Sequence, residues 1–132
     1  MKLKKSQGFL LVAAVALAVG SWASGYAAGA STLKTPNTVI HHVAFQWKAS
    51  ATEADKAKVV ADLKAIVSEV PGALNLWVKS VKVQPQGFSQ TFVIEFADEA
   101  ALKAYAAHPK KKAWNDLYYS LREVSHNNVT TN

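Results

Sequence analysis

Apolar and polar residues alternate along several stretches of the chain, and this period of two is typical of β-strands. The pattern predicts strands over residues 39–48, 74–83, 88–96 and 121–130. In the first of these strands one face is drier than the other, and it carries His41, Val43, Phe45 and Trp47. The second strand has large apolar side chains on both faces, so we expect both faces of the sheet to be covered.

A helical period follows the first strand and predicts an amphipathic helix over residues 53–70. Its apolar positions are Val59, Leu63, Ile66, Val67 and Val70. Two N-caps are open: Ser50 has capping-box spacing to Glu53, and Thr52 is the alternative. Pro71 and Gly72 end the helix, because proline cannot continue it and glycine accepts the left-handed conformation that follows.

A second helix is predicted over residues 99–107, with Asp98 as its N-cap. Pro109 ends it, because the residue before a proline is biased away from helical geometry. Residues 110–119 are expected to form a further short helical turn that carries Trp114, Leu117 and Tyr118.

The predicted order β-α-β-β-α-β is that of an α+β fold, the ferredoxin-like split βαβ arrangement. Its two helices can cover only one face of the antiparallel sheet. The other face is therefore expected to be buried against a second copy of the chain, so that two sheets stack in a dimeric α/β barrel.

The first thirty residues have the layout of a secretory signal, with Lys2, Lys4 and Lys5 before an apolar run and Ala28-Gly29-Ala30 at the cleavage position. Residues 31–37 are expected to be a flexible leader, and residues 38–130 one small domain. The alternative is an uncleaved membrane anchor, because no charged residue occurs between Phe9 and Ala30.

Charge and cysteine content exclude several classes of function. The formal charge is +6, but three of the fifteen basic residues lie in the predicted signal, which leaves twelve against nine acidic residues, a charge of +3. A nucleic-acid partner is therefore not expected. The chain has no cysteine, which excludes disulfides, thiolate catalysis and cysteine metal sites. We expect no cofactor and no metal, since the histidines and carboxylates lack metal-ligand spacing.

Four segments resemble the Dabb family of stress-responsive dimeric α/β-barrel domains. They are residues 40–48, Val70-Pro71-Gly72, residues 92–96 and residues 102–109. The resemblance implies a dimeric barrel with a cleft between sheet and helices in each subunit. Some members are linked to stress tolerance in plants, and one similar plant protein cyclises a polyketide with a histidine and a tyrosine in the cleft.

By motif position, His41 matches the first-strand histidine of the family and Tyr105 matches the tyrosine of the second helix. Similar members often have a second histidine, which is the base of the cyclase, where this chain has Lys111. A lysine at its usual pKa is charged and can replace that base only when it is strongly desolvated. Phe45 and His108 complete the set expected at the ligand site.

Each of these residues also has a structural interpretation. His41 fits a hydrogen-bonded core or interface position, Tyr105 fits core packing, and His108 fits a helix C-terminus, where the macrodipole favours it. The run Lys110 to Lys112 fits a solvated face, with contact to lipid or a polyanion as the alternative.

The function expected from the sequence is therefore an exported homodimer that binds a small apolar or aromatic ligand. One alternative is a cofactor-free enzyme of the same barrel group, a polyketide cyclase, lyase or monooxygenase, with His41 and Tyr105 as the catalytic candidates. Another is a structural envelope protein. Membrane contact is expected only if the N-terminal segment is uncleaved.

Overall fold

The structure is a computed structural model that describes residues 36–83 and 86–132. The predicted signal and most of the predicted leader lie outside these residues. The described elements, in chain order, are β1 (Val39–Trp47), α2 (Glu53–Ser68), β2 (Ala73–Trp77), β3 (Gln90–Phe96), α3 (Glu99–Ala106), α4 (Lys111–Leu121) and β4 (Arg122–Thr130). None of the described helices has the length and apolarity needed to cross a membrane.

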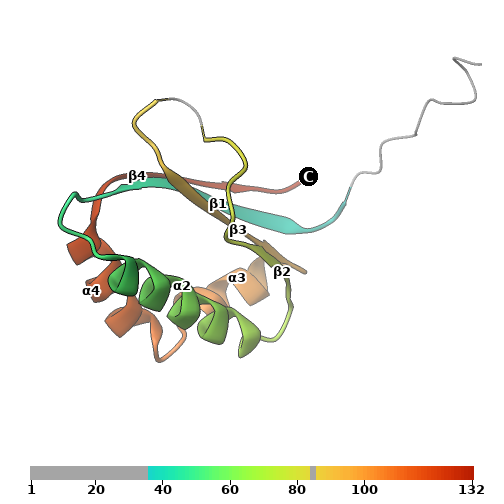
Figure 1. The fold of residues 1–132 in the computed structure, drawn as a ribbon. Helices are drawn as coiled ribbons and strands as arrows, with labels where there is room; N and C mark the ends of the chain where they lie inside the picture. The colour runs from blue at the N-terminus through green and yellow to red at the C-terminus, as the bar shows by residue number, and fades with distance from the viewer. Residues whose placement is uncertain (1–35, 84–85) are drawn as a thin grey trace, which may run out of the picture. The chain divides into compact units, whose positions relative to one another are not determined.

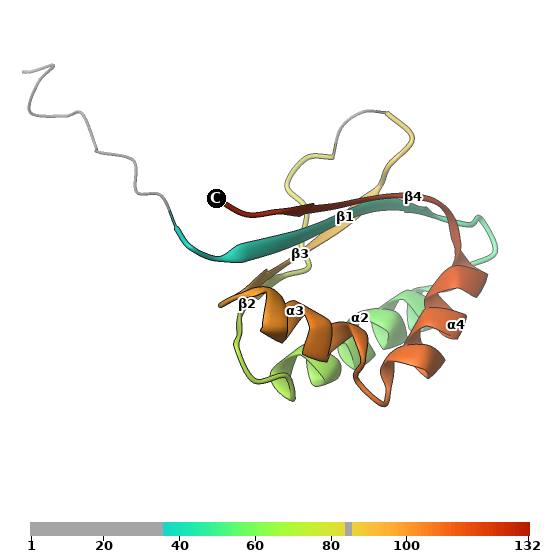
Figure 2. The same ribbon diagram turned by 180° about the vertical axis from the view of Figure 1, so that it is seen from behind.

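The four strands form one antiparallel sheet in the order β2-β3-β1-β4. All three helices lie against the same face of this sheet, as the two opposite views in Figures 1 and 2 show. In the register of β1, His41 is opposite Ile94 of β3 and Val129 of β4, so these side chains share the helix-covered face. The ferredoxin-like α+β fold predicted from the sequence is confirmed.

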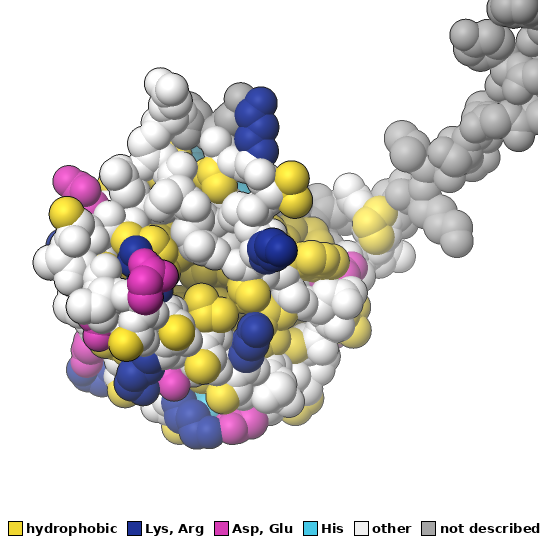
Figure 3. All heavy atoms as spheres, in the orientation of Figure 1, with side chains coloured by type: hydrophobic (Ala, Val, Ile, Leu, Met, Phe, Trp, Pro, Cys, Tyr) yellow, Lys and Arg dark blue, Asp and Glu magenta, His cyan; other side chains and the backbone are white. Residues whose placement is uncertain are grey.

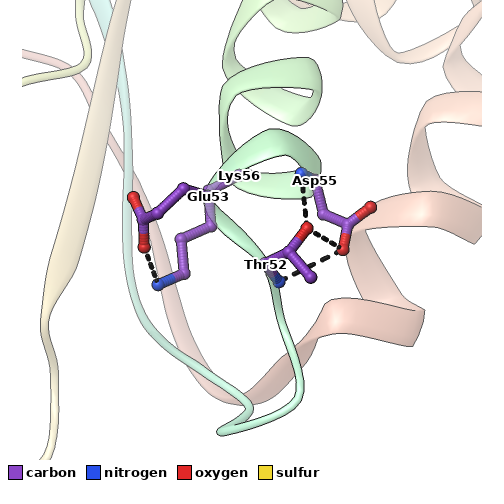
Figure 4. A network of polar contacts seen from close by, with 4 residues as sticks. All are labelled: Thr52, Glu53, Asp55 and Lys56. Carbon is purple, nitrogen blue, oxygen red and sulfur yellow. Dashed lines mark hydrogen bonds and ion pairs between the residues drawn. The ribbon is translucent and has the colours of Figure 1, made fainter.

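The N-terminus of α2 is capped by Thr52, so the Ser50 alternative was wrong. The Thr52 hydroxyl accepts a hydrogen bond from the Asp55 backbone N–H at 3.2 Å. The Asp55 carboxylate in turn accepts from the Thr52 backbone N–H at 3.1 Å and from the Thr52 hydroxyl at 2.6 Å (Figure 4). Spacing alone did not separate the two candidates. A capping box needs an acidic residue three positions after the cap, and both pairs, Thr52 with Asp55 and Ser50 with Glu53, have this spacing.

The core lies between α2 and the sheet. Its most deeply buried large side chains are apolar and come from α2, β1 and β3: Val59, Leu63, Ile66, Phe45, Ile94 and Phe96. The indole Nε1 of Trp114 donates to the Val59 carbonyl at 2.9 Å, which ties α4 to α2. The buried indole N–H of Trp114 therefore has a hydrogen-bond partner within this core.

Strand β2 is shorter than predicted, because ladder pairing stops at Trp77. Beyond it, side chains replace the backbone ladder. The Ser80 hydroxyl accepts from the Thr91 backbone N–H at 2.8 Å, and the Gln90 amide donates to the Val78 carbonyl at 2.6 Å. The prediction of a strand to residue 83 was therefore wrong, since Ser80 supplies the bond that a paired strand would have supplied.

Gly72 and Asp98 set the position of α3. Gly72 has φ +84°, and a Cβ there would lie 2.8 Å from the Ala101 Cβ, so only glycine allows this close approach. Asp98 caps α3 as predicted, accepting from the Ala101 backbone N–H at 2.9 Å. Together they hold the first turn of α3 close to the turn between α2 and β2.

The largest departure from the predicted order is α4, an eleven-residue helix where a short turn was expected. The described order is thus β-α-β-β-α-α-β. Trp114 and Tyr118 lie one turn apart on the buried side of α4. Helix α4 is therefore a third helix on this face of the sheet, in addition to the two that were predicted.

The face of the sheet away from the helices carries large apolar side chains. In register, Val93 of β3 is flanked there by Trp77 of β2 and His42 of β1, and Val124 of β4 lies further along. Trp77 is 51% exposed and Val124 is 43% exposed. This outer face is therefore uncovered in the isolated chain.

The charged side chains that Figure 3 shows are of both signs and are interspersed with apolar ones over the visible face. No single-sign basic patch gathers on that face. Nucleic-acid binding depends on such a patch, so this face lacks the charge pattern for it.

Candidate functional site

A cleft of about 350 Å³ lies between the sheet and the pair of helices α3 and α4. Its walls come from β1, β3, β4 and both helices, and its lining is mostly apolar and aromatic. The side chains that carry polar groups into it include His41, Tyr105, Lys111, Tyr118 and Asn127. Three of the residues proposed from the sequence, His41, Tyr105 and Lys111, are thus brought together.

His41 projects from β1 into the cleft, on the same face as Val43 and Phe45. Its ring centroid is 6.1 Å from that of Tyr105, and its Nδ1 is buried without a hydrogen-bond partner among the described residues. Burial lowers the pKa of the His41 imidazole, and the positive charge of Lys111 lowers it further. The ring is therefore neutral at pH 7 and able to accept a proton.

Tyr105 stands on α3, and only 3% of its surface is exposed. Its ring packs against Phe96 at a centroid distance of 5.4 Å, while its hydroxyl is buried and unpaired among the described residues. Burial raises the pKa of the Tyr105 hydroxyl well above its usual range. The group therefore stays protonated and can donate a hydrogen bond to a molecule in the cleft.

Lys111 is the first residue of α4, and its side chain lines the cleft. Its Nζ lies 3.9 Å from the Trp114 ring centroid and 4.7 Å from that of Tyr105, and it donates to Asn115 Oδ1 at 2.9 Å. Burial lowers the pKa of the Lys111 amine to about 8. A lysine that is desolvated in this way can lose its proton near neutral pH and act as a base.

Tyr118 is a site residue that the sequence analysis did not identify. It stacks on Trp114 with ring centroids 4.9 Å apart, and its hydroxyl lies close to the Ser125 side chain. Burial raises the pKa of the Tyr118 hydroxyl to about 12. A signal was present, because Lys111, Trp114 and Tyr118 follow helical spacing, but it depended on reading residues 110–119 as a full helix.

Phe45 and His108 do not line the cleft. Phe45 is 1% exposed and packs edge-on against Tyr118, behind the cleft wall. His108 faces α2: its Nε2 lies 3.2 Å from a Glu69 carboxylate oxygen, and its Nδ1 accepts from the Lys110 backbone N–H at 3.3 Å. The structure thus favours the structural interpretation of His108, a residue that links the end of α3 to the end of α2.

The three consecutive lysines do not form one basic patch. Lys110 pairs with Glu69, the C-cap of α2, and Lys112 pairs with Asp116 one turn along α4. Lys111 points into the cleft between them. In the part of the chain that the structure describes, no group of three metal-ligating side chains comes together.

Chemically, the cleft combines neutral proton acceptors with protonated hydroxyl donors inside an aromatic lining. His41 and a neutral Lys111 can accept protons, and Tyr105 and Tyr118 can donate hydrogen bonds. Such a site can orient a small aromatic molecule, and it has the groups that acid–base chemistry needs.

The family model of the stress-responsive A/B barrel domain (Dabb) matches residues 39–125, from the start of β1 into β4. The chain belongs to this family. All residues that line the cleft lie within the matched range except Asn127 and Val129 of β4. No match was found among curated proteins.

Solved structures share this fold at low sequence identity. A Dabb family protein from Mesorhizobium loti is 23% identical, with a TM-score of 0.61 over 72% of this chain and 96% of that one. The cofactor-independent oxygenase SnoaB from Streptomyces nogalater is 17% identical, with a TM-score of 0.60 over 73% and 93%. A hydroxynitrile lyase from Passiflora edulis is 14% identical, with a TM-score of 0.65 over 72% and 93%. Other structures with this fold are dimeric ferredoxin-like proteins.

Proposed function

We propose that this Dabb protein is an exported homodimer that binds a small aromatic molecule bearing a hydroxyl or carbonyl group. The observation that carries the proposal is two unpaired buried atoms in one cleft, His41 Nδ1 and Tyr105 Oη. A buried polar atom without a partner costs about 1 to 3 kcal/mol, so a ligand that pairs with these atoms recovers that free energy. The aromatic walls favour a flat ligand.

The dimer is supported by the outer face of the sheet. Trp77, Val93 and Val124 would remain in water in a monomer, and a second copy with the same face covers them by two-fold symmetry. Proteins of similar fold are dimers. Sedimentation of the purified protein at micromolar concentration should give the mass of a dimer.

Export is supported by the N-terminal sequence alone. Lys2, Lys4 and Lys5 precede an apolar run and the small residues Ala28-Gly29-Ala30. N-terminal sequencing of protein from its own host should begin near Ser31. Full-length chain that resists carbonate extraction from membranes would establish an anchor instead.

Calorimetry with two related probes tests the binding proposal. The wild-type protein should bind 2-naphthol more tightly than naphthalene, because only the former can pair with the buried polar atoms. Replacing Tyr105 by Phe or His41 by Ala should weaken 2-naphthol binding by about 1 to 3 kcal/mol. His108→Ala is the control and should leave affinity unchanged, since His108 lies outside the cleft. Equal affinity for both probes would contradict the proposal.

A second candidate function is that of an enzyme that catalyses proton transfer without a cofactor. Burial lowers the pKa of Lys111 to about 8, closer to the pH at which it would act as a base, and it keeps His41 neutral and able to accept a proton. An oxygenase and a lyase share the fold, which makes catalysis a reasonable alternative. Assays on linear polyketide substrates separate the two functions: turnover that is lost in His41→Ala would establish the enzyme, and binding without turnover would establish the binding protein.

A further inference from the structure

Three adjacent lysines in the first turn of α4 have different environments. Lys110 and Lys112 each have a carboxylate partner, Glu69 and Asp116 respectively. Among the described residues, Lys111 has no carboxylate within 4.0 Å of its nitrogen. Its one hydrogen-bond partner is the neutral amide oxygen of Asn115, at 2.9 Å. The ammonium ions of Lys110 and Lys112 are each stabilised by a carboxylate. Lys111 has no such negative charge beside it.

The position of Lys111 on the helix also disfavours its charge. It lies at the first residue of α4, where the helix dipole is positive, and α4 has no acidic residue in its first turn. Its neighbours in sequence are both cationic. The contacts that compensate are cation–π contacts, with the Trp114 ring at 3.9 Å and the Tyr105 ring at 4.7 Å.

The neutral amine is therefore populated under ordinary conditions. Burial brings the pKa of Lys111 to about 8, so about a tenth of the molecules carry the neutral form at pH 7 and about half at pH 8. An exposed lysine is almost wholly charged at these pH values. A neutral amine in a dry cleft is a nucleophile.

We infer that Lys111 forms a reversible imine with an aromatic aldehyde held in the cleft. The inference deepens the proposed function, on whose cleft it rests, by naming a carbonyl compound as the ligand class. Lys111 Nζ attacks the carbonyl carbon to give a carbinolamine. The nitrogen then loses its remaining proton as the hydroxyl leaves, so the C–N double bond forms and one water is released, without any oxidant or reductant.

The other polar groups of the cleft fit this reaction. Tyr105 has an unpaired hydroxyl that can donate to the carbonyl oxygen, and His41 is a neutral acceptor for the proton that the amine loses. The titratable groups that share the cleft with Lys111 come from β1, α3 and α4: His41, Tyr105, Tyr118 and Tyr119. From β3 and β4 the cleft receives Phe92, Asn127 and Val129, which do not titrate.

Reductive trapping tests the inference on the purified full domain. The protein is incubated with 2-naphthaldehyde at pH 7.5 and treated with sodium borohydride, which reduces an imine to a stable secondary amine. Peptide mapping should place the adduct on Lys111 at least tenfold faster than on Lys110 or Lys112. Lys111→Arg should abolish the fast adduct, and Lys112→Arg should retain it. Equal rates at the three lysines would overturn the inference.

The pH profile provides a second readout. The trapping rate at Lys111 should level off above about pH 8, whereas the rate at Lys112, whose pKa is raised by Asp116, should still be rising at pH 10. Parallel profiles would contradict a nucleophile at Lys111. Binding of 2-naphthol by the same preparations separates the two proposals. Binding without trapping would support the proposed function and contradict the imine. Trapping without 2-naphthol binding would support the imine and contradict the proposed function.

Discussion

The helix-covered side of the sheet has two regions with opposite character. Beneath α2 the side chains are apolar and closely packed, with Leu63 and Ile66 at 1% exposure. Beneath α3 and α4 the same face opens into a cleft in which His41 and Tyr105 each leave a polar atom unpaired. One sheet thus supports both a stabilising core and a site that costs stability. A binding site requires this difference, because polar groups that already have hydrogen-bond partners in the protein cannot form hydrogen bonds with a ligand.

The largest expected effect is in the packed region. Leu63→Ala should lower the free energy of unfolding by about 2 to 5 kcal/mol, because it leaves a cavity among rigid neighbours. Leu102→Ala, at the cleft wall, should cost less than about 2 kcal/mol, since the atoms removed already border open space. Urea unfolding of both variants measures the difference. Equal losses would mean that the cleft region is packed as tightly as the core.

The turn between α2 and β2 should be nearly as sensitive. Gly72→Ala adds a Cβ 2.8 Å from the Ala101 Cβ at φ +84°, which should cost about 2 to 4 kcal/mol from backbone strain and overlap together. Gly87→Ala is the matched control, with φ +102° and no atom within 4 Å of the new Cβ. It should cost about 1 kcal/mol, from strain alone. Thermal unfolding of the pair separates the two contributions.

A smaller effect is expected at the start of α2. Thr52→Ala should lower stability by about 1 kcal/mol, because it removes the N-cap hydrogen bond to the Asp55 backbone. Ser50→Ala should have almost no effect. The reverse order in chemical denaturation would restore the Ser50 cap and contradict the structure.

The pH dependence of stability reports on Lys111. Its pKa is lowered from 10.5 to about 8 in the folded protein, so between these values the unfolded chain binds the extra proton and stability rises with pH. Tyr105 and Tyr118, with raised pKa values, act in the opposite direction above about pH 10. Unfolding of wild type and Lys111→Met should therefore be compared from pH 7 to 10. The rise in wild-type stability should be smaller or absent in the variant, and identical slopes would show that Lys111 is not desolvated.

The sequence predicted the packed region better than the cleft. Alternation along β1 correctly assigned Val43 and Phe45 to the buried face, because period-two burial is a local property of a strand. It could not show that Phe45 lies behind the cleft wall, since that depends on where Tyr118 packs. The family resemblance identified Lys111 as a site residue. Its burial could not be predicted from the sequence, because it depends on where α4 places the Trp114 ring.

Two errors have local physical causes. Trp77 to Val83 has strand character, but the Ser80 hydroxyl takes the Thr91 N–H and ends the ladder, which no periodicity can reveal. His108 was assigned to the ligand site because it follows Tyr105 by three residues. It comes directly after the C-cap of α3, however, and its imidazole reaches Glu69 instead.

The most direct test of the account is the unfolding of wild type and Tyr105→Phe with and without 2-naphthol. Without ligand, the variant should be as stable as wild type or slightly more stable, because it loses a buried hydroxyl that has no partner. With ligand, wild type should be stabilised more than the variant, since binding to the folded state raises the unfolding midpoint. If Tyr105→Phe instead destabilises the free protein and the ligand shifts both midpoints equally, the hydroxyl serves the fold and the cleft is not the binding site.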